Sequence, residues 1–388
     1  MVEEPARGFP QEEFVARTAR AQAGMAEHGL AGLLLTTEPE VRYFTGFQTL
    51  FWQSPSRPWF VFVPATGKPI AIIPEIGAAL MRSTWIDDIR TWSAPAPHDD
   101  GISLLVDMLA PLAQEGAQIG LMKGHETHLR MPLGDYEHLL SALPGLTISD
   151  ATPLIRRLRM VKSPAEIEKL AHICAIGANT FDLVPDIARA GTEQIELFRE
   201  FRRAALAAGA DDVPYLVGGA GPGGYRDVIS PPTRRPLAPG DIVMLDTGCI
   251  WDGYFCDFDR NFAIGHADDT ARRAYDTLWR ATEAGLAAAR PDTTCRDLFH
   301  AMHDVIREMD PDGGDVGRLG HGLGMQLTEW PSHAAWDDTV LEEGMVLTLE
   351  PSLSYGDGLM MVHEESIVIP SGPACLMTAR AAAELPVI

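Results

Sequence analysis

Five side chains that can bind metal ions, spread over strand-like stretches of the second half of the chain, constrain the possible folds most strongly. Asp246 closes the apolar run 242–245 and is followed by Thr247-Gly248, which predicts a strand that runs into a turn. Asp257 comes eleven residues later, in a stretch rich in aromatic residues. Because Trp251-Asp252-Gly253 lies between them, we expect a hairpin that brings the two carboxylates face to face.

The other three side chains also flank strand-like runs. His321 lies in Gly320-His321-Gly322-Leu323-Gly324, where missing side chains let the backbone approach a ligand closely. Glu350 ends the run 345–349, and Glu364 precedes the run 367–369. Four carboxylates are thus expected at the ends or edges of strands. Crowded together without a cation they would repel one another, and divalent metal ions would remove that conflict.

Taken singly, each of these residues has a simpler interpretation. An Asp after a strand is usually a turn former, and a Glu before a strand is usually solvated. Glu365 is an alternative to Glu364 as a ligand, although the alternation of faces along the following strand favours Glu364. Asp259 shares a strand face with Asp257 and would add or orient a ligand, but surface exposure is the plainer expectation. His300 and His303 lie three apart on a predicted helix without a third ligand nearby, which favours surface or packing roles.

The ordered set resembles the pita-bread metallohydrolases, the family of methionine aminopeptidase, aminopeptidase P, prolidase and creatinase. The resemblance covers nearly the whole chain: Tyr43-Phe44-Thr45-Gly46-Phe47 looks like the "YxTG" turn of the family's amino-terminal domain, and residues 159–167 look like its domain junction. It implies an α+β fold, with a creatinase-like α/β N-terminal domain in residues 1–158 and a pita-bread catalytic domain in residues 159–388.

The resemblance also implies a mechanism. Asp246, Asp257 and Glu364 would bind or bridge two divalent ions (Mn, Fe, Co or Zn), and His321 and Glu350 would complete the site. Two cations lower the pKa of a bridging water, so that a metal-bound hydroxide is available near neutral pH. The catalytic residues would be His321 and Glu350, with Glu350 also carrying a proton to the leaving group.

Three departures from the family's peptidases bear on the substrate. Thr328 stands where the peptidases carry a histidine, Val362 stands where an arginine is common, and residues 227–240 lack a further histidine. Metal binding is therefore expected to persist while peptide-handling groups are missing. This favours hydrolysis of a small amide or peptide-like substrate over ordinary Xaa-Pro peptides.

Two alternatives follow from the same resemblance. Residues 328–332 are similar to the family branch that contains the metal-dependent lyase acting on dimethylsulfoniopropionate, although Gly248 occupies the place of that branch's extra aspartate. Other members are binding modules without a metal site, and creatinase itself works without metal. The filled ligand positions argue against a binding module.

Composition limits the partners and the compartment. The chain of 388 residues carries 54 acidic and 31 basic side chains, a net charge of −23 that should repel nucleic acid and anionic lipid. No run of about 18 apolar residues occurs and the amino terminus is acidic, so neither a membrane span nor a secretory signal is expected. Five dispersed cysteines favour a reducing compartment, the cytoplasm, with Cys249 and Cys256 packing as thiols.

Local patterns predict the individual elements. Helices are expected over about 11–30, from Ser163-Pro164 onward, and over about 193–208, 268–289 and 295–309. Strands are expected at 31–35 and in a hairpin of 59–63 with 70–73, whereas the glycine cluster 218–224 is expected to be a flexible loop. The family's N-terminal domain often reaches a neighbouring subunit, which implies a homodimer in which Trp52 or Arg57 helps to close the pocket; a buried core cluster is the alternative.

Overall fold

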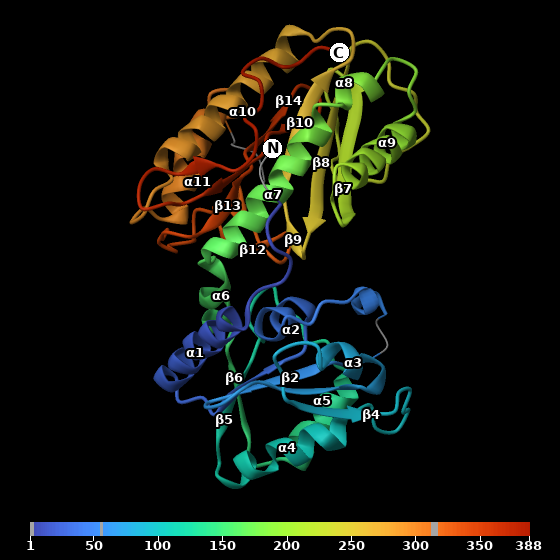
Figure 1. Ribbon diagram of the computed structural model, residues 1–388. Helices are drawn as coiled ribbons and strands as arrows, with labels where there is room; N and C mark the ends of the chain where they lie inside the picture. Colours follow the sequence, from blue (N-terminus) through green and yellow to red (C-terminus); the bar gives the residue numbers. More distant parts are fainter. Residues whose placement is uncertain (1–3, 55–56, 312–316) are drawn as a thin grey trace. The chain divides into compact units, whose positions relative to one another are not determined.

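The computed structural model describes residues 4–54, 57–311 and 317–388 and divides into two compact units. The N-terminal unit is Ala6–Arg159, and the C-terminal unit is built from Met160–Ile388 (Figure 1). Among the described residues, no helix is both long enough and apolar enough to cross a lipid bilayer.

The N-terminal unit is an α/β domain around one six-stranded sheet with the order β4-β3-β2-β1-β5-β6. The pairs β1–β5, β5–β6 and β3–β4 are parallel, and the pairs β1–β2 and β2–β3 are antiparallel. The α-helices and strands are α1 Gln11–Glu27, β1 Gly32–Leu35, α2 Glu38–Thr45, β2 Phe60–Pro64, β3 Ile70–Pro74, α3 Ala78–Met81, β4 Asp88–Trp92, α4 Ile102–Gln114, β5 Gln118–Leu121, α5 Leu133–Ala142, β6 Thr147–Asp150 and α6 Thr152–Met160.

The elements expected in this unit are confirmed. Helix α1 and strand β1 cover the predicted segments, and β2 and β3 form the predicted antiparallel hairpin. Trp52 and Trp59 are both buried, with ring centroids 5.7 Å apart, and Arg130 lies over the Trp52 ring at 4.9 Å. Within this unit the aromatic cluster is therefore part of the core. Whether Trp52 or Arg57 also serves a second subunit stays a prediction.

The C-terminal unit is α+β, and its strands are antiparallel. One sheet has the order β10-β8-β7, and β9 also pairs with β8. A second sheet has the order β12-β11-β13-β16-β17, and β14 and β15 form a separate pair. Helices α10 and α11 lie beside each other, at the side of the unit away from α9 (Figure 1). The elements are α7 Pro164–Phe181, α8 Val184–Ile187, α9 Gln194–Ala207, β7 Asp212–Pro222, β8 Asp241–Trp251, β9 Tyr254–Phe255, β10 Phe258–Ala263, α10 Asp269–Ala288, α11 Cys295–Ile306, β11 His321–Gly322, β12 Glu329–Ser332, β13 Val346–Leu349, β14 Ser352–Tyr355, β15 Leu359–Val362, β16 Glu365–Val368 and β17 Cys375–Leu376.

The predicted helices of this unit are present, and α7 begins as the sequence indicates. The Ser163 side chain accepts from the backbone N–H of Glu166, whose carboxylate accepts from the N–H of Ser163. This reciprocal pair satisfies two backbone donors that the first helical turn leaves unpaired.

Strand β8 separates two apolar clusters because its side chains alternate between the two faces. Val243 and Leu245 join the cluster formed with α7 and α9, whereas Ile242 and Met244 join the cluster formed with α10, α11 and β13. By the same period of two, Asp246 points to the side of Ile242 and Met244, toward the second sheet.

The expectation of a flexible glycine loop at 218–224 is wrong. Gly218 to Gly221 belong to β7 and pair with residues 245 to 242 of β8. A Cβ added to Gly218, whose φ is +153°, would lie 2.1 Å from the carbonyl oxygen of Met244. Glycine is thus required here by close approach of two strands, and not by mobility.

Candidate metal centre

The first two proposed ligands come from the hairpin of β8, β9 and β10, as the sequence predicts. Asp246 pairs with Asp259 across β8 and β10, and Asp257 directly precedes β10. Two details differ from the expectation. The residue paired with Asp246 is Asp259 and not Asp257, and Asp246 lies in the middle of the eleven-residue β8 and not at a strand end. Thr247-Gly248 does not form the predicted turn, because Thr247 is paired with both β7 and β10 and Gly248 is paired with β7.

His321 is held in one orientation by its backbone neighbours. Its Nδ1 lies 2.9 Å from the carbonyl oxygen of Gly322, which can only accept, so Nδ1 carries the proton and Nε2 presents its lone pair. The Nε2 atom lies 3.5 Å from Asp257 Oδ2 and 3.8 Å from Glu350 Oε2. Burial lowers the pKa of His321 to about 3, so the ring is neutral and able to bind a cation.

Glu350 and Glu364 approach from the second sheet. Glu350 follows β13, and Glu364 directly precedes β16, so both lie at strand ends as expected. Ligand atoms of Asp257, His321 and Glu364 all lie within 4.8 Å of one another, and these three side chains are buried. The Glu350 side chain is 32% exposed, which places it at the solvent side of the group.

The carboxylates of this cluster resist ionisation in the absence of a cation. Burial raises the pKa of Asp246 to about 6 and that of Glu350 to about 7, with Asp246 adding to the effect on Glu350. Burial, followed by the neighbouring carboxylates, raises the pKa values of Asp257 and Glu364 well above their usual range. The charge of Arg318 opposes these shifts at Asp257 and Glu350 but does not outweigh burial and the repulsion between the acids.

The donor set fits divalent cations. Asp246 Oδ1 and Glu364 Oε1 are buried carboxylate oxygens without a hydrogen-bond partner in the described part of the chain, although buried polar atoms are nearly always bonded. Several carboxylate oxygens and one imidazole suit manganese, iron, cobalt or zinc. The residues present therefore fit the metal ions that the sequence implies.

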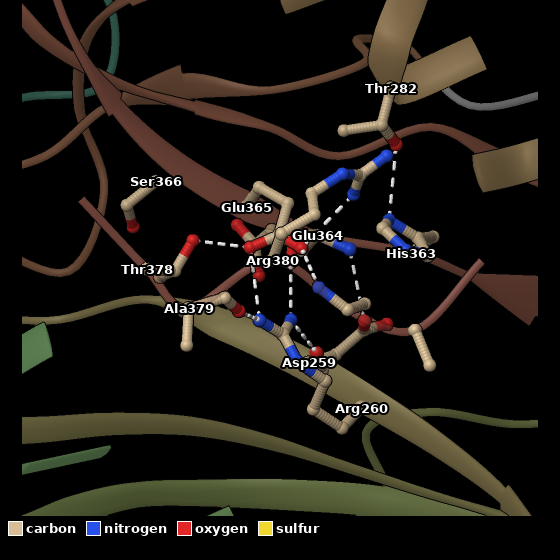
Figure 2. A network of polar contacts seen from close by, with 12 residues as sticks. Asp259, Arg260, Thr282, His363, Glu364, Glu365, Ser366, Thr378, Ala379 and Arg380 are labelled. Carbon is tan, nitrogen blue, oxygen red and sulfur yellow. Dashed lines mark hydrogen bonds and ion pairs between the residues drawn. The ribbon is translucent and has the colours of Figure 1, made fainter. Parts of the chain in front are cut away.

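Glu365, the alternative to Glu364, is engaged elsewhere (Figure 2). Arg260 and Arg380 each donate to its carboxylate at 3.0 Å, and the N–H of Ala381 and the hydroxyl of Thr378 also donate to it. Burial alone would raise the pKa of Glu365, but Arg260 and the hydrogen bonds hold that pKa below its usual value. Glu365 is thus an ionised anchor behind the cluster, which leaves Glu364 as the candidate ligand.

Asp259 and Tyr215 are two further polar residues at this site. Asp259 is only 1% exposed, so the expectation of surface exposure is wrong, and burial raises its pKa well above the usual range. A sequence signal existed, because Asp257, Asp259 and Asn261 recur at every second residue and therefore share one face of the strand. Tyr215 was not singled out by any motif; its hydroxyl donates to Asp246 Oδ2 at 3.1 Å.

The positions of the missing peptidase groups are well ordered but chemically different. Thr328 is exposed, and the neighbouring Glu329 is buried and pairs with Lys162 at 3.3 Å. Val362 is buried, and its backbone N–H donates to the hydroxyl of Tyr225. Away from the cluster, His300 and His303 lie on α11, where both rings contact Phe299.

Comparison with known proteins decides the family. The model of metallopeptidase family M24 matches residues 168–371, which include all five candidate ligands, and the Creatinase/Prolidase N-terminal domain matches residues 17–161. The chain belongs to metallopeptidase family M24. The pita-bread resemblance and the order of the two domains are therefore confirmed, and the protein is a metallohydrolase.

Similar proteins share the whole architecture. A protein named "Probable dipeptidase PepE" from Mycobacterium tuberculosis is 30% identical over 94% of this chain and 93% of its own length. An Xaa-Pro dipeptidase of Lactobacillus helveticus is 30% identical over 81% and 83%. The solved structure of dipeptidase PepE from Mycobacterium ulcerans has a TM-score of 0.83 at 28% identity and covers 98% of this chain and 99% of its own. The similarity to these proteins thus extends over both units of this chain.

Proposed function

We propose that this M24 metallohydrolase cleaves a C–N bond in a small amide or peptide-like substrate at a centre of two divalent cations. Asp246, Asp257, His321, Glu350 and Glu364 would hold these ions. The observation that carries the proposal is the convergence of ligand atoms of Asp257, His321, Glu350 and Glu364 from two sheets. Buried oxygens of Asp246 and Glu364 that have no partner among the described residues support it.

Each side chain has a distinct role in this proposal. When bound, the cations lower the pKa of water and polarise a carbonyl oxygen. His321 presents a neutral Nε2 because Gly322 holds the proton on Nδ1. Glu350 is the group best suited to move a proton to the leaving nitrogen, because it is the most exposed of the five and its pKa is raised to about 7.

The substrate preference follows from what surrounds the ligands. Two relatives carry the name Xaa-Pro dipeptidase or dipeptidase, so short peptides are the first compounds to test. At Thr328 an exposed hydroxyl replaces an imidazole, and at Val362 an isopropyl group replaces a guanidinium. Fewer donors at the scissile carbonyl mean weaker stabilisation of developing negative charge, so Xaa-Pro dipeptides should be poor substrates.

A panel of substrates offered to metal-reconstituted protein tests this proposal. Manganese, iron, cobalt and zinc forms would be given Xaa-Pro dipeptides, other dipeptides and small amides, with release of amine as the readout. Support would be amine release from small amides at rates well above those from Xaa-Pro dipeptides. Robust turnover of Xaa-Pro dipeptides would overturn the proposed substrate preference. Release of volatile dimethyl sulfide from dimethylsulfoniopropionate would show that the protein is a lyase and not a hydrolase.

We further propose that the protein is a homodimer in a reducing compartment, the cytoplasm. The family resemblance favours the dimer, and five free cysteines, four of them buried, fit a reducing compartment. Light scattering on a gel-filtration column would measure the mass directly. A single chain of 42.2 kDa at micromolar concentration would exclude the stable dimer.

A further inference from the structure

Asp259 is a buried acid beside the proposed ligands with only one of its two carboxylate oxygens bonded. Its side chain is 1% exposed. The Oδ1 atom accepts the backbone N–H of Glu364 at 2.9 Å, a contact drawn in Figure 2. The Oδ2 atom is buried and has no hydrogen-bond partner within residues 4–54, 57–311 and 317–388. An unpaired buried carboxylate oxygen is costly, so this atom requires a partner that the protein itself does not supply.

The strand register places this oxygen next to the centre. Asp259 is paired directly with Asp246 across β10 and β8. Side chains of directly paired residues point to the same face of a sheet, with Cβ atoms about 4.5–5.5 Å apart. Asp246 also has one unpaired buried oxygen, Oδ1. Two facing carboxylates, each with an unsatisfied oxygen, destabilise a sheet unless a cation lies between or beside them.

Arg260, the next residue along the chain, does not bond the unpaired oxygen. The guanidinium of Arg260 donates to the carbonyl oxygens of Asp259, Glu364 and Ala379 and to the carboxylate of Glu365. Among the described residues its hydrogen bonds thus go to Glu365 and to three carbonyl oxygens, and none goes to Asp259 Oδ2. The role of Asp259 in holding the Glu364 N–H also needs no second oxygen, because a neutral amide oxygen could accept that bond equally well.

We propose that Asp259 is a further ligand of the cation centre, with Oδ2 binding a divalent ion beside Asp246. The inference rests on the proposed function, because it requires that the centre holds metal. It extends the ligand set from five residues to six. It also gives a physical reason for an acid, and not merely a hydrogen-bond acceptor, at this buried position.

The test is the isosteric variant Asp259→Asn, in which an amide oxygen can still accept from Glu364. Binding of Mn²⁺ and Zn²⁺ would be measured by competition with a chromophoric chelator, and thermal unfolding would be measured in the presence of EDTA. We expect the affinity for at least one of the two ions to fall about tenfold or more. We also expect the metal-free variant to melt at the same temperature as the metal-free wild type or at a higher one. The second result is expected because the substitution removes one of the mutually repelling acids.

Asp337→Asn is the matched control. Asp337 is also buried, at 4% exposure, but both its oxygens are bonded, Oδ1 to the Thr339 N–H and Oδ2 to the Ser332 N–H, each at 2.9 Å. This variant should lower the melting temperature of the metal-free protein and leave metal affinity unchanged.

Two outcomes would overturn the inference. Unchanged affinity in Asp259→Asn would show that Oδ2 binds no ion. A loss of affinity accompanied by a lower melting temperature of the metal-free variant would assign Asp259 to positioning Glu364 only. Failure of the wild type to bind stoichiometric metal would instead refute the proposed function itself, so the two failures are distinguishable.

Discussion

Metal loading should release protons, and the number released should fall sharply between pH 6.5 and pH 8. The proposed ligands Asp246 and Glu350 have pKa values raised to about 6 and about 7 in the metal-free protein. Cations bind the ionised forms, so each proton held by these groups must leave when metal enters. Affinity should therefore rise with pH, tenfold per pH unit for each proton displaced.

The magnitude follows from these two pKa values. At pH 6.5, Glu350 is about three-quarters protonated and Asp246 about one-quarter protonated, which together amount to roughly one proton. At pH 8 the two groups together retain only about 0.1 proton. Asp257 and Glu364, whose pKa values are raised well above their usual range, add further release. The difference between the two pH values attributable to Asp246 and Glu350 is thus about 0.9 proton.

Isothermal titration calorimetry in buffers of unlike ionisation enthalpy measures this number directly. Metal-free protein would be titrated with Mn²⁺ at pH 6.5 and at pH 8, and the dependence of the heat on the buffer gives the protons released. In Glu350→Gln the contribution of Glu350 disappears, so the difference should fall by about 0.7 proton. Asp337→Asn should behave like the wild type, because the two groups that Asp337 bonds are backbone N–H groups of Ser332 and Thr339 and not any of the proposed ligand side chains. Equal release at both pH values, or no release at pH 6.5, would show that the two carboxyls are already ionised and refute the reasoning.

Three substitutions test how the centre is supported. Arg260→Met leaves the buried carboxylate of Glu365 with one arginine instead of two. In a urea titration the free energy of unfolding should fall by about 3 kcal/mol, and a decrease below about 1 kcal/mol would contradict the proposed role of Glu365 as an anchor. Gly320→Ala places a Cβ 2.3 Å from the carbonyl oxygen of Thr348 at a φ of +133°, and should cost at least about 2 kcal/mol by the same assay. Gly372→Ala, whose added Cβ meets no atom of the described residues within 4 Å, should be neutral. Tyr215→Phe removes the hydroxyl that donates to Asp246 and should weaken Mn²⁺ binding about tenfold in a chelator competition; unchanged binding would show that Tyr215 does not orient this ligand.

Patterns of short range predicted much of the fold. The capping box of Ser163 and Glu166 located the start of α7, because the two bonds that define it join residues three apart. The hairpin around Trp251-Asp252-Gly253 was likewise visible as two strand-like stretches around a turn signal. The candidate ligands were recognised as an ordered set. The structure brings Asp257, His321, Glu350 and Glu364 close to one another, and Asp246 lies on the same hairpin as Asp257.

Features that depend on distant parts of the chain were not predictable in this way. Thr247-Gly248 lies inside β8 because β7 and β10 pair with it from both sides. The glycines of β7 are strand residues because the β8 backbone comes too close for a side chain at Gly218. Asp259 is buried because the second sheet covers its face, where the backbone of Glu364 donates to it. Burial and close approach are decided by tertiary packing, which local sequence patterns do not contain.

Anomalous diffraction from crystals of the manganese- or zinc-loaded protein would test the central claim most directly. The account predicts two peaks per chain, about 3.5–4 Å apart, bound by Asp246, Asp257, His321, Glu350 and Glu364. Metal ions bound elsewhere, or no peak among these five side chains in protein shown to be saturated with metal, would contradict it.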